Sequence, residues 1–203
     1  MARRESRAPT LLWFAAVLLI AAPCARAPEP FGSDAALSRA EVDDPDVEAV
    51  RAQLVPLDRQ IGATECDALA SALVAASREH DLPPAFVLAV IEVESRFDPY
   101  AVSPVGALGL MQILPSTGAP VARRLGIGWR GPQTLFDPRA NVRIGVAYLR
   151  ELIDRYANVR AALAAYNWGP GEIDARLRNG TVLPVTYVER VLDAYSNGRR
   201  TDS

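Results

Sequence analysis

The side chains of this sequence that could do chemistry near neutral pH are mainly carboxylates and tyrosines. Histidine occurs once, as His80, and lysine does not occur, so every basic side chain is an arginine. Schiff-base chemistry and the phosphate-binding lysine of a P-loop are therefore excluded. Histidine-rich zinc sites are excluded as well, and a Ser-His-Asp triad would depend on His80 alone. We expect no metal site and no cofactor.

Glu94 is the carboxylate whose surroundings suit acid catalysis. The segment around it has apolar residues three and four positions apart, which predicts a helix: Phe86, Val90, Val93 and Phe97. Glu94 then lies beside apolar side chains of neighbouring turns, whereas Glu92 points roughly the opposite way, into water. Desolvation raises the pKa of a carboxyl group, as a general acid requires near neutral pH.

The loop after this helix could bring the backbone close to a ligand. Asp98-Pro99 ends the helix, and Ser, Pro and Gly residues follow up to Gln112. Glycine permits close approach of the backbone, and Met111 and Gln112 add a flexible apolar contact and an amide. Further along, Tyr166, Asn167 and Trp168 offer polar tips and a flat ring. We interpret these segments as parts of a carbohydrate cleft.

Composition limits the size of the protein and the classes of partner. The chain has 203 residues, of which 50% are hydrophobic, and this suits one domain plus a short extension. A net charge of -2 gives no basic face for nucleic acid. We expect a monomer.

The first 27 residues have the pattern of a secretory signal peptide. Three arginines precede an apolar run, Leu11 to Ala22, and Ala25-Arg26-Ala27 is a small-x-small cleavage site. This pattern predicts export to the periplasm. An uncleaved membrane anchor, or a lipid on Cys24, remains an alternative. Cleavage would leave Cys66 without a partner, so we predict a buried, inert thiol there and no disulfide.

Residues 28–62 are acidic and interrupted by prolines, apart from a predicted short helix at residues 46–54. We interpret this segment as a mobile linker without a core of its own, which could also dock a partner. A domain is predicted over residues 63–196, followed by a polar tail at 197–203.

The domain is predicted to be all-α. Thr64 to Asp67 fits a capping box that opens a helix ending near Glu79. Asn141 fits the N-cap of another helix that ends near Tyr156. Further helices are expected at residues 84–97, 119–125, 159–167, before 177, and 185–195, with a long loop at 126–136. No convincing run of alternating strand residues is present.

Four motifs in order resemble the soluble lytic transglycosylases, the goose-lysozyme-like enzymes of transglycosylase family 1. They are Glu94-Ser95, the segment from Ser103 to Gly109-Leu110-Met111-Gln112, Asn141-x-x-x-Gly145-x-x-Tyr148-Leu149, and Ala165-Tyr166-Asn167-x-Gly169. The resemblance covers about Cys66 to Tyr195 and implies a single lysozyme-like domain. It also implies cleavage of the MurNAc–GlcNAc β-1,4 bond in peptidoglycan glycan strands. Glu94 would act as acid and then as base, and the 6-hydroxyl of the sugar would attack to give a 1,6-anhydro product.

The resemblance also implies the residues of the cleft. Ser95, Ser103, Met111 and Gln112 would line it, Tyr166 would hold and polarise Glu94, and Asn167 and Tyr187 would contact substrate. Members of the family commonly carry a Glu-Thr pair shortly before the final Tyr-Val. The segment Pro184-Val185-Thr186-Tyr187-Val188 lacks that glutamate. The match at Tyr187 is therefore weaker than the match at Tyr166.

Three alternatives accompany this reading. A goose-type muramidase on the same fold would hydrolyse the bond, with Asp98 or Asp137 as candidates to place the water. A non-catalytic wall-binding domain would keep the fold without the reaction. The enzyme could also serve a secretion or conjugation machinery rather than general wall turnover.

Overall fold

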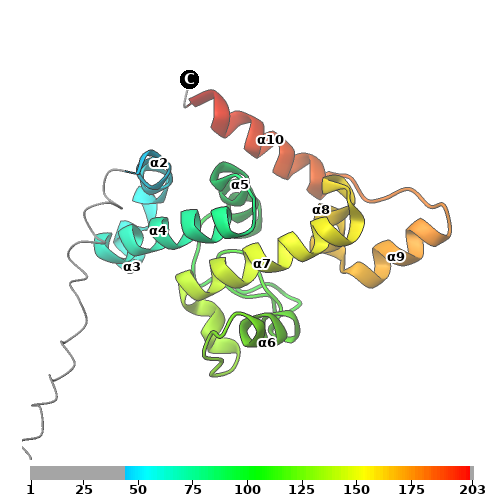
Figure 1. Ribbon diagram of the computed structural model, residues 1–203, viewed down its shortest axis with the longest axis horizontal. Helices are drawn as coiled ribbons and strands as arrows, with labels where there is room; N and C mark the ends of the chain where they lie inside the picture. Colours follow the sequence, from blue (N-terminus) through cyan, green and yellow to red (C-terminus); the bar gives the residue numbers. More distant parts are fainter. Residues whose placement is uncertain (1–43, 202–203) are drawn as a thin grey trace, which may run out of the picture. The chain divides into compact units, whose positions relative to one another are not determined.

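The computed structural model describes residues 44–201, and these residues form helices joined by loops (Figure 1). The α-helices are α2 (Pro45–Leu54), α3 (Asp58–Ile61), α4 (Ala63–Glu79), α5 (Pro84–Ser95), α6 (Pro115–Arg124), α7 (Pro138–Tyr156), α8 (Val159–Trp168), α9 (Pro170–Arg178) and α10 (Thr186–Thr201). Two 3-10 helices, η1 (Val55–Leu57) and η2 (Pro132–Phe136), complete the set. Within residues 44–201 the only β pairing is two isolated bridges in the loop between α5 and α6. The prediction of an all-α fold is confirmed.

The predicted signal peptide and the first part of the predicted linker lie outside the described residues. Among the helices of residues 44–201, none combines the length and the apolar character that crossing a bilayer requires.

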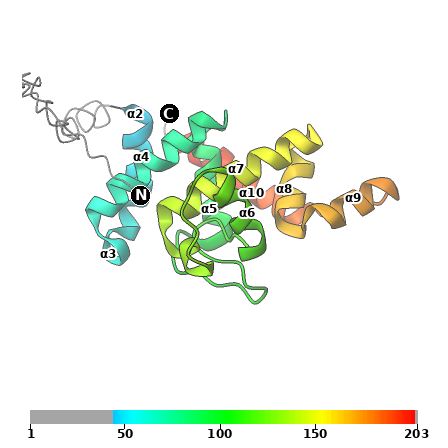
Figure 2. The same cartoon turned by 60° about the horizontal axis from the view of Figure 1, so that its bottom comes forward.

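Helix α7 lies at the centre of the core. It packs against α8, α4, α6 and η2, and Figures 1 and 2 both place it alongside α8. Its buried side chains include Val142, Val146 and Leu149 on one face and Ile144 on the opposite face, so α7 is covered on more than one side. Helix α5 packs against α10 along a second seam. This seam joins segments far apart in the sequence, and it holds the carboxylate singled out above.

The two predicted helix caps, at Thr64 and at Asn141, both differ from the structure. Helix α4 begins at Ala63 after Gly62, and no side chain caps it, so the predicted capping box is wrong. The Asp67 carboxylate pairs instead with Arg51 of α2. Helix α7 begins at Pro138, and its N-cap is Asp137, which accepts from the backbone N–H of Arg139 and Ala140. Asn141 therefore lies inside the helix, where it is buried.

The expectation of a linker without a core is wrong for the residues from Asp44 onward. Helix α2 packs against α4, and Val50, Leu54 and Leu57 are each at most 1% exposed within the common core. Burying three such side chains stabilises the fold by several kcal/mol, at roughly 1.5–3 kcal/mol each. The helical domain therefore includes residues 45–62 as well.

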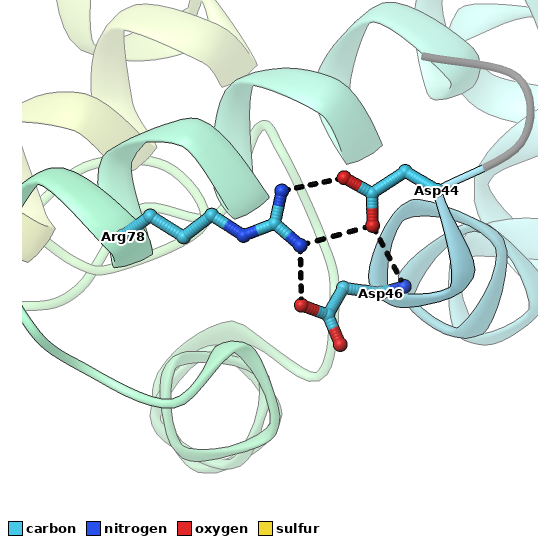
Figure 3. Close-up of polar contacts among 3 residues, drawn as sticks. All are labelled: Asp44, Asp46 and Arg78. Carbon is cyan, nitrogen blue, oxygen red and sulfur yellow. Dashed lines mark hydrogen bonds and ion pairs between the residues drawn. The ribbon is translucent and has the colours of Figure 1, made fainter. Parts of the chain in front are cut away.

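Ion pairs use the acidic residues of this segment. The Arg78 guanidinium of α4 donates to Asp44 at 2.5 and 2.9 Å and to Asp46 at 2.6 Å (Figure 3). The hydrogen bonds from Arg78 lower the pKa of Asp44. These carboxylates therefore pair with an arginine of the same domain, in ion pairs that remain exposed to solvent.

Other helix ends also differ from their predicted positions. Helix α5 stops at Ser95, because Arg96 and Phe97 adopt left-handed backbone angles, with φ of 53° and 63°. Helix α6 begins at Pro115, a residue suited to a first turn. Helix α10 continues to Thr201, since no proline interrupts the sequence there. The predicted polar tail is thus helical through residue 201. Cys66 is fully buried, and burial raises the pKa of its thiol to about 11, as expected for an inert cysteine.

Candidate active site

Glu94 lies in the last turn of α5, between an apolar core and α10. The preceding residues, Phe86 to Ile91, are all buried, and Glu92 is exposed, as the helical spacing predicted. Glu94 itself is partly buried. Burial raises the pKa of its carboxyl group to about 7, while a hydrogen bond from Tyr187 and the charge of Arg190 lower it. A large fraction of Glu94 therefore carries a proton at neutral pH.

Tyr187 supplies the hydroxyl group that forms a hydrogen bond with Glu94. It lies in the first turn of α10, is buried, and donates to Glu94 Oε1 at 2.6 Å. Burial, and then the charge of Glu94, raise the pKa of Tyr187 well above its ordinary value, so the hydroxyl keeps its proton. The sequence had favoured Tyr166 for this contact and was wrong. The packing of α10 on α5 sets the position of Tyr187, so this position does not depend on the glutamate that is missing from the preceding loop.

Arg190 is a functional candidate that the sequence reasoning missed. It follows Tyr187 by three residues, so both side chains lie on the same face of α10. Its Nη2 donates to the Val93 carbonyl oxygen at 3.3 Å, at the end of α5 where carbonyls lack helical partners. The spacing from Tyr187 was the one signal that could have indicated it.

Tyr166 stands near Glu94 but makes a different hydrogen bond. Its hydroxyl donates to the Met111 carbonyl oxygen at 2.9 Å, and its ring lies 5.5 Å from that of Tyr148. Burial raises the pKa of Tyr166 first, and the charge of Glu94 raises it further. Tyr166 therefore connects α8 to the loop between α5 and α6 through this hydrogen bond.

Met111 belongs to the core rather than to the surface of a cleft. Its side chain is fully buried, and a Cβ added at Gly145 would lie only 2.4 Å from its sulfur. Its backbone N–H donates to Asn141 Oδ1 at 2.8 Å. The same Asn141 donates to the carbonyl oxygens of Leu108 and Leu135 at 2.9 and 2.8 Å. Asn141 thus fixes the loop to α7, and the expectation that the Met111 side chain lines a cleft is wrong.

The polar side chains of the loop hold its shape. Gln112 has a φ of 49°, and its amide donates to the carbonyl oxygens of Ala101 and Gly109 at 3.1 and 3.0 Å. Ser103 Oγ accepts from the Ala107 N–H at 2.9 Å, and Ser95 Oγ donates to the Ile91 carbonyl oxygen at 3.1 Å. Ser95, Ser103 and Gln112 remain partly exposed.

A cavity of about 260 Å³ brings together three of the predicted residues, Gln112, Tyr166 and Asn167. Trp168 and Tyr148 also line it. A larger hollow of about 550 Å³ lies along α5 and α10, where Val93 and Arg190 contribute to its wall. Throughout residues 44–201, His, Cys, Asp and Glu form no cluster of three or more that could hold a metal ion. The described residues bring together one carboxyl group with raised pKa and two neighbouring tyrosines.

The described residues combine helices with one carboxyl group of raised pKa, and Tyr166, near that group, lines a cavity with polar and aromatic residues. This combination is that of a lysozyme-like protein. Residues 71–182 match the model of the transglycosylase SLT domain, more than half of the chain, so this chain belongs to that family.

Two curated relatives illustrate the match. The soluble lytic murein transglycosylase of Salmonella typhimurium is 38% identical over 119 residues, which are 57% of this chain and 18% of that protein. The transglycosylase of Enterobacteria phage PRD1 is 41% identical over 98 residues, 48% of this chain and 34% of that protein. The chain thus spans between about a fifth and a third of the length of these relatives.

Two solved structures have the same fold. One is the 70-kDa soluble lytic transglycosylase of Escherichia coli, with a TM-score of 0.60 and 27% identity over 75% of this chain and 29% of that one. The other is an inactive mutant of the lytic transglycosylase Slt of Pseudomonas aeruginosa, with a TM-score of 0.59 and 25% identity over 81% of this chain and 32% of that one.

Proposed function

We propose that this chain is a peptidoglycan lytic transglycosylase that uses Glu94 as its one acid–base group. The observation that carries the proposal is the partly buried Glu94 carboxyl, whose pKa burial raises to about 7. Such a group holds a proton at neutral pH and can also release it, as alternate acid and base steps require. The names of the relatives, lytic murein transglycosylases, support the same activity.

The proposed reaction cleaves the β-1,4 bond between MurNAc and GlcNAc. Protonated Glu94 gives its proton to the bridging oxygen, the bond from that oxygen to C1 of MurNAc breaks, and GlcNAc leaves with a new hydroxyl. The 6-hydroxyl oxygen of the same MurNAc bonds to C1, and ionised Glu94 accepts the proton of that hydroxyl. The products are a GlcNAc end and a 1,6-anhydroMurNAc end, and no water is consumed.

Tyr187 has a defined task in this scheme. By donating to Glu94 Oε1, it orients the carboxyl and stabilises the ionised form that exists between the two proton transfers. Tyr166 acts through the Met111 carbonyl oxygen and so positions the loop. Ser95, Ser103, Gln112 and Asn167 are proposed contacts for the glycan strand.

The hydrolase alternative would need a second group to place a water molecule. The two candidates each serve their own loop: Asp98 accepts from the Tyr100 N–H at 2.9 Å, and Asp137 caps α7. Most glycosidases that use water or a protein nucleophile have two carboxylates across the bond. The contacts of Asp98 and Asp137 therefore give the muramidase reading no specific support.

Mass spectrometry of digested peptidoglycan tests the proposal directly. Purified protein should release muropeptides with anhydro-muramyl ends, whereas a muramidase would release reducing ends and a wall-binding domain would release nothing. Glu94→Gln should lower turnover by about 10²–10⁴-fold while the far-UV circular dichroism stays unchanged. Asp98→Asn is the matched control, since it changes a carboxylate outside the proposed acid–base step. Full activity of Glu94→Gln would refute the assignment.

We also propose that residues 1–27 direct export to the periplasm and that the protein acts there on glycan strands, as a monomer. Fractionation of cells that express the full chain, with N-terminal sequencing of the product, separates cleavage after Ala27 from a retained anchor or a lipid on Cys24. Service to a secretion or conjugation machinery is the narrower proposal. Co-purification of such a machinery with the exported chain would support it.

A further inference from the structure

Trp168 is a large aromatic side chain that the acid–base site does not use. It is the last residue of α8 and is 53% exposed, although tryptophan is usually mostly buried. It lines the 260 Å³ cavity together with Gln112, Tyr166 and Asn167. An exposed aromatic side chain on the wall of a cavity, with amides beside it, is typical of a ligand site.

A neighbouring arginine keeps the indole ring in place without burying it. The Arg176 guanidinium lies over the ring, 5.8 Å from its centroid. Arg176 is itself held at two points, by Glu172 Oε1 at 2.7 Å and by the Val182 carbonyl oxygen at 3.1 Å. A cation over one face of an indole is attracted by the ring electrons. The ring is therefore braced by α9, and its remaining surface stays accessible.

We propose that Trp168 is a stacking platform for one pyranose ring of the glycan strand, next to the Glu94 site. This inference rests on the proposed function and adds a subsite to it. The apolar C–H face of a sugar would lie on the indole. The Asn167 amide and the Gln112 amide oxygen would meet its hydroxyl and acetamido groups, since the Gln112 nitrogen already donates to the loop. A cavity of about 260 Å³ is at the small end of ligand sites, which suits a single sugar unit.

A protein partner is the competing occupant of an exposed tryptophan. The cavity favours a sugar, because polar amides and a tyrosine flank the indole within one concave site. The core of a protein interface is instead depleted of charge. Here the charged Arg176 already lies over the ring.

Calorimetric titration with an N-acetylglucosamine hexasaccharide tests the inference, in the Glu94→Gln background so that nothing is cut. Trp168→Ala should raise the Kd about three- to tenfold, the usual scale for loss of one aromatic contact. Trp168→Phe should recover most of the affinity, and Trp168→Leu should not, because it keeps apolar bulk without a flat face. Val55→Ala is the matched control: it removes an exposed apolar side chain of η1 that does not line the cavity and should leave the Kd unchanged.

The outcomes separate the two proposals. An unchanged Kd in Trp168→Ala, with cutting by the wild type intact, would overturn the platform and leave the proposed function standing. It would instead point to a protein partner. Equal recovery by Leu and Phe would overturn stacking as the mode of contact. If the Glu94→Gln parent binds no glycan and the wild type cuts none, both the platform and the proposed function are wrong.

Discussion

Tyr187→Phe removes one oxygen atom and isolates the contact that tunes the proposed acid. The hydroxyl donates to Glu94 Oε1 at 2.6 Å, so it stabilises the ionised carboxylate and lowers the pKa of Glu94. Burial acts in the opposite direction and is the larger effect, which leaves the pKa at about 7. Without the hydroxyl, the neutral form of Glu94 becomes more stable relative to the ionised form, and the pKa of Glu94 rises further.

The size of the effect follows from the hydrogen bond. A hydrogen bond to a charged group contributes about 1.5–3 kcal/mol, and the lower value applies because Glu94 is partly exposed and water can replace the tyrosine. One pKa unit corresponds to about 1.36 kcal/mol. We therefore expect the pKa of Glu94 to move from about 7 to about 8.

The assay is the pH dependence of kcat/KM for release of anhydro-muropeptides, which reports the free enzyme. A general acid is active when protonated, so the wild type should lose activity as pH rises through about 7. In Tyr187→Phe that loss should occur about one pH unit higher, at a lower maximal rate, because the carboxyl is less well oriented. The control is Tyr156→Phe, whose hydroxyl bonds Asp174 and the Pro170 carbonyl oxygen instead. A falling limb that stays in place or moves to lower pH would refute the reasoning.

Three further predictions concern stability. Folding raises the pKa of Glu94 from 4.5 to about 7, so the folded state loses stability as pH rises between these values. Glu94→Gln should therefore be more stable than the wild type by about 2 kcal/mol at pH 8 and equally stable at pH 4, as measured by thermal melts. Asn141→Ala removes three hydrogen bonds to buried backbone groups, of which the Leu108 carbonyl oxygen keeps the Ile113 N–H as a partner, and it should cost about 3 kcal/mol in urea unfolding. The exposed cap Asn158→Ala should cost about 1 kcal/mol, and equal losses would contradict the bridging role. Leu54→Ala should cost about 3 kcal/mol and Arg78→Ala clearly less, whereas a neutral Leu54→Ala would mean that α2 is not part of the core.

The local sequence was sufficient for the helices and for the position of the acid. Apolar spacing of three and four residues places α5, and the same spacing separates partly buried Glu94 from exposed Glu92. Both the raised pKa of Glu94 and the buried state of Cys66 follow from such patterns, because desolvation depends on which helix face is covered. The order of four motifs indicated the family without any knowledge of the fold.

Contacts between distant segments were beyond the reach of the sequence. The carboxylates of Asp44 and Asp46 resembled those of a solvated linker, because their arginine partner, Arg78, occurs 32 or more residues later, in α4. Pro45, which suits a first turn, indicated a helix at residues 46–54, but only the packing of α2 on α4 made Val50 and Leu54 part of the core.

The choice between the two tyrosines shows the same limit at the active site. Both Tyr166, which is partly buried, and Tyr187, which is buried, lie near Glu94, and either could have donated to it. The pairing joins residues 93 positions apart and depends on how α10 lies along α5. Helical periodicity therefore indicated that Glu94, rather than Glu92, is the carboxylate that is partly removed from solvent. The packing of two helices decided which hydroxyl reaches it, because a hydrogen bond tolerates only a few tenths of an ångström and no local pattern records interhelical distance.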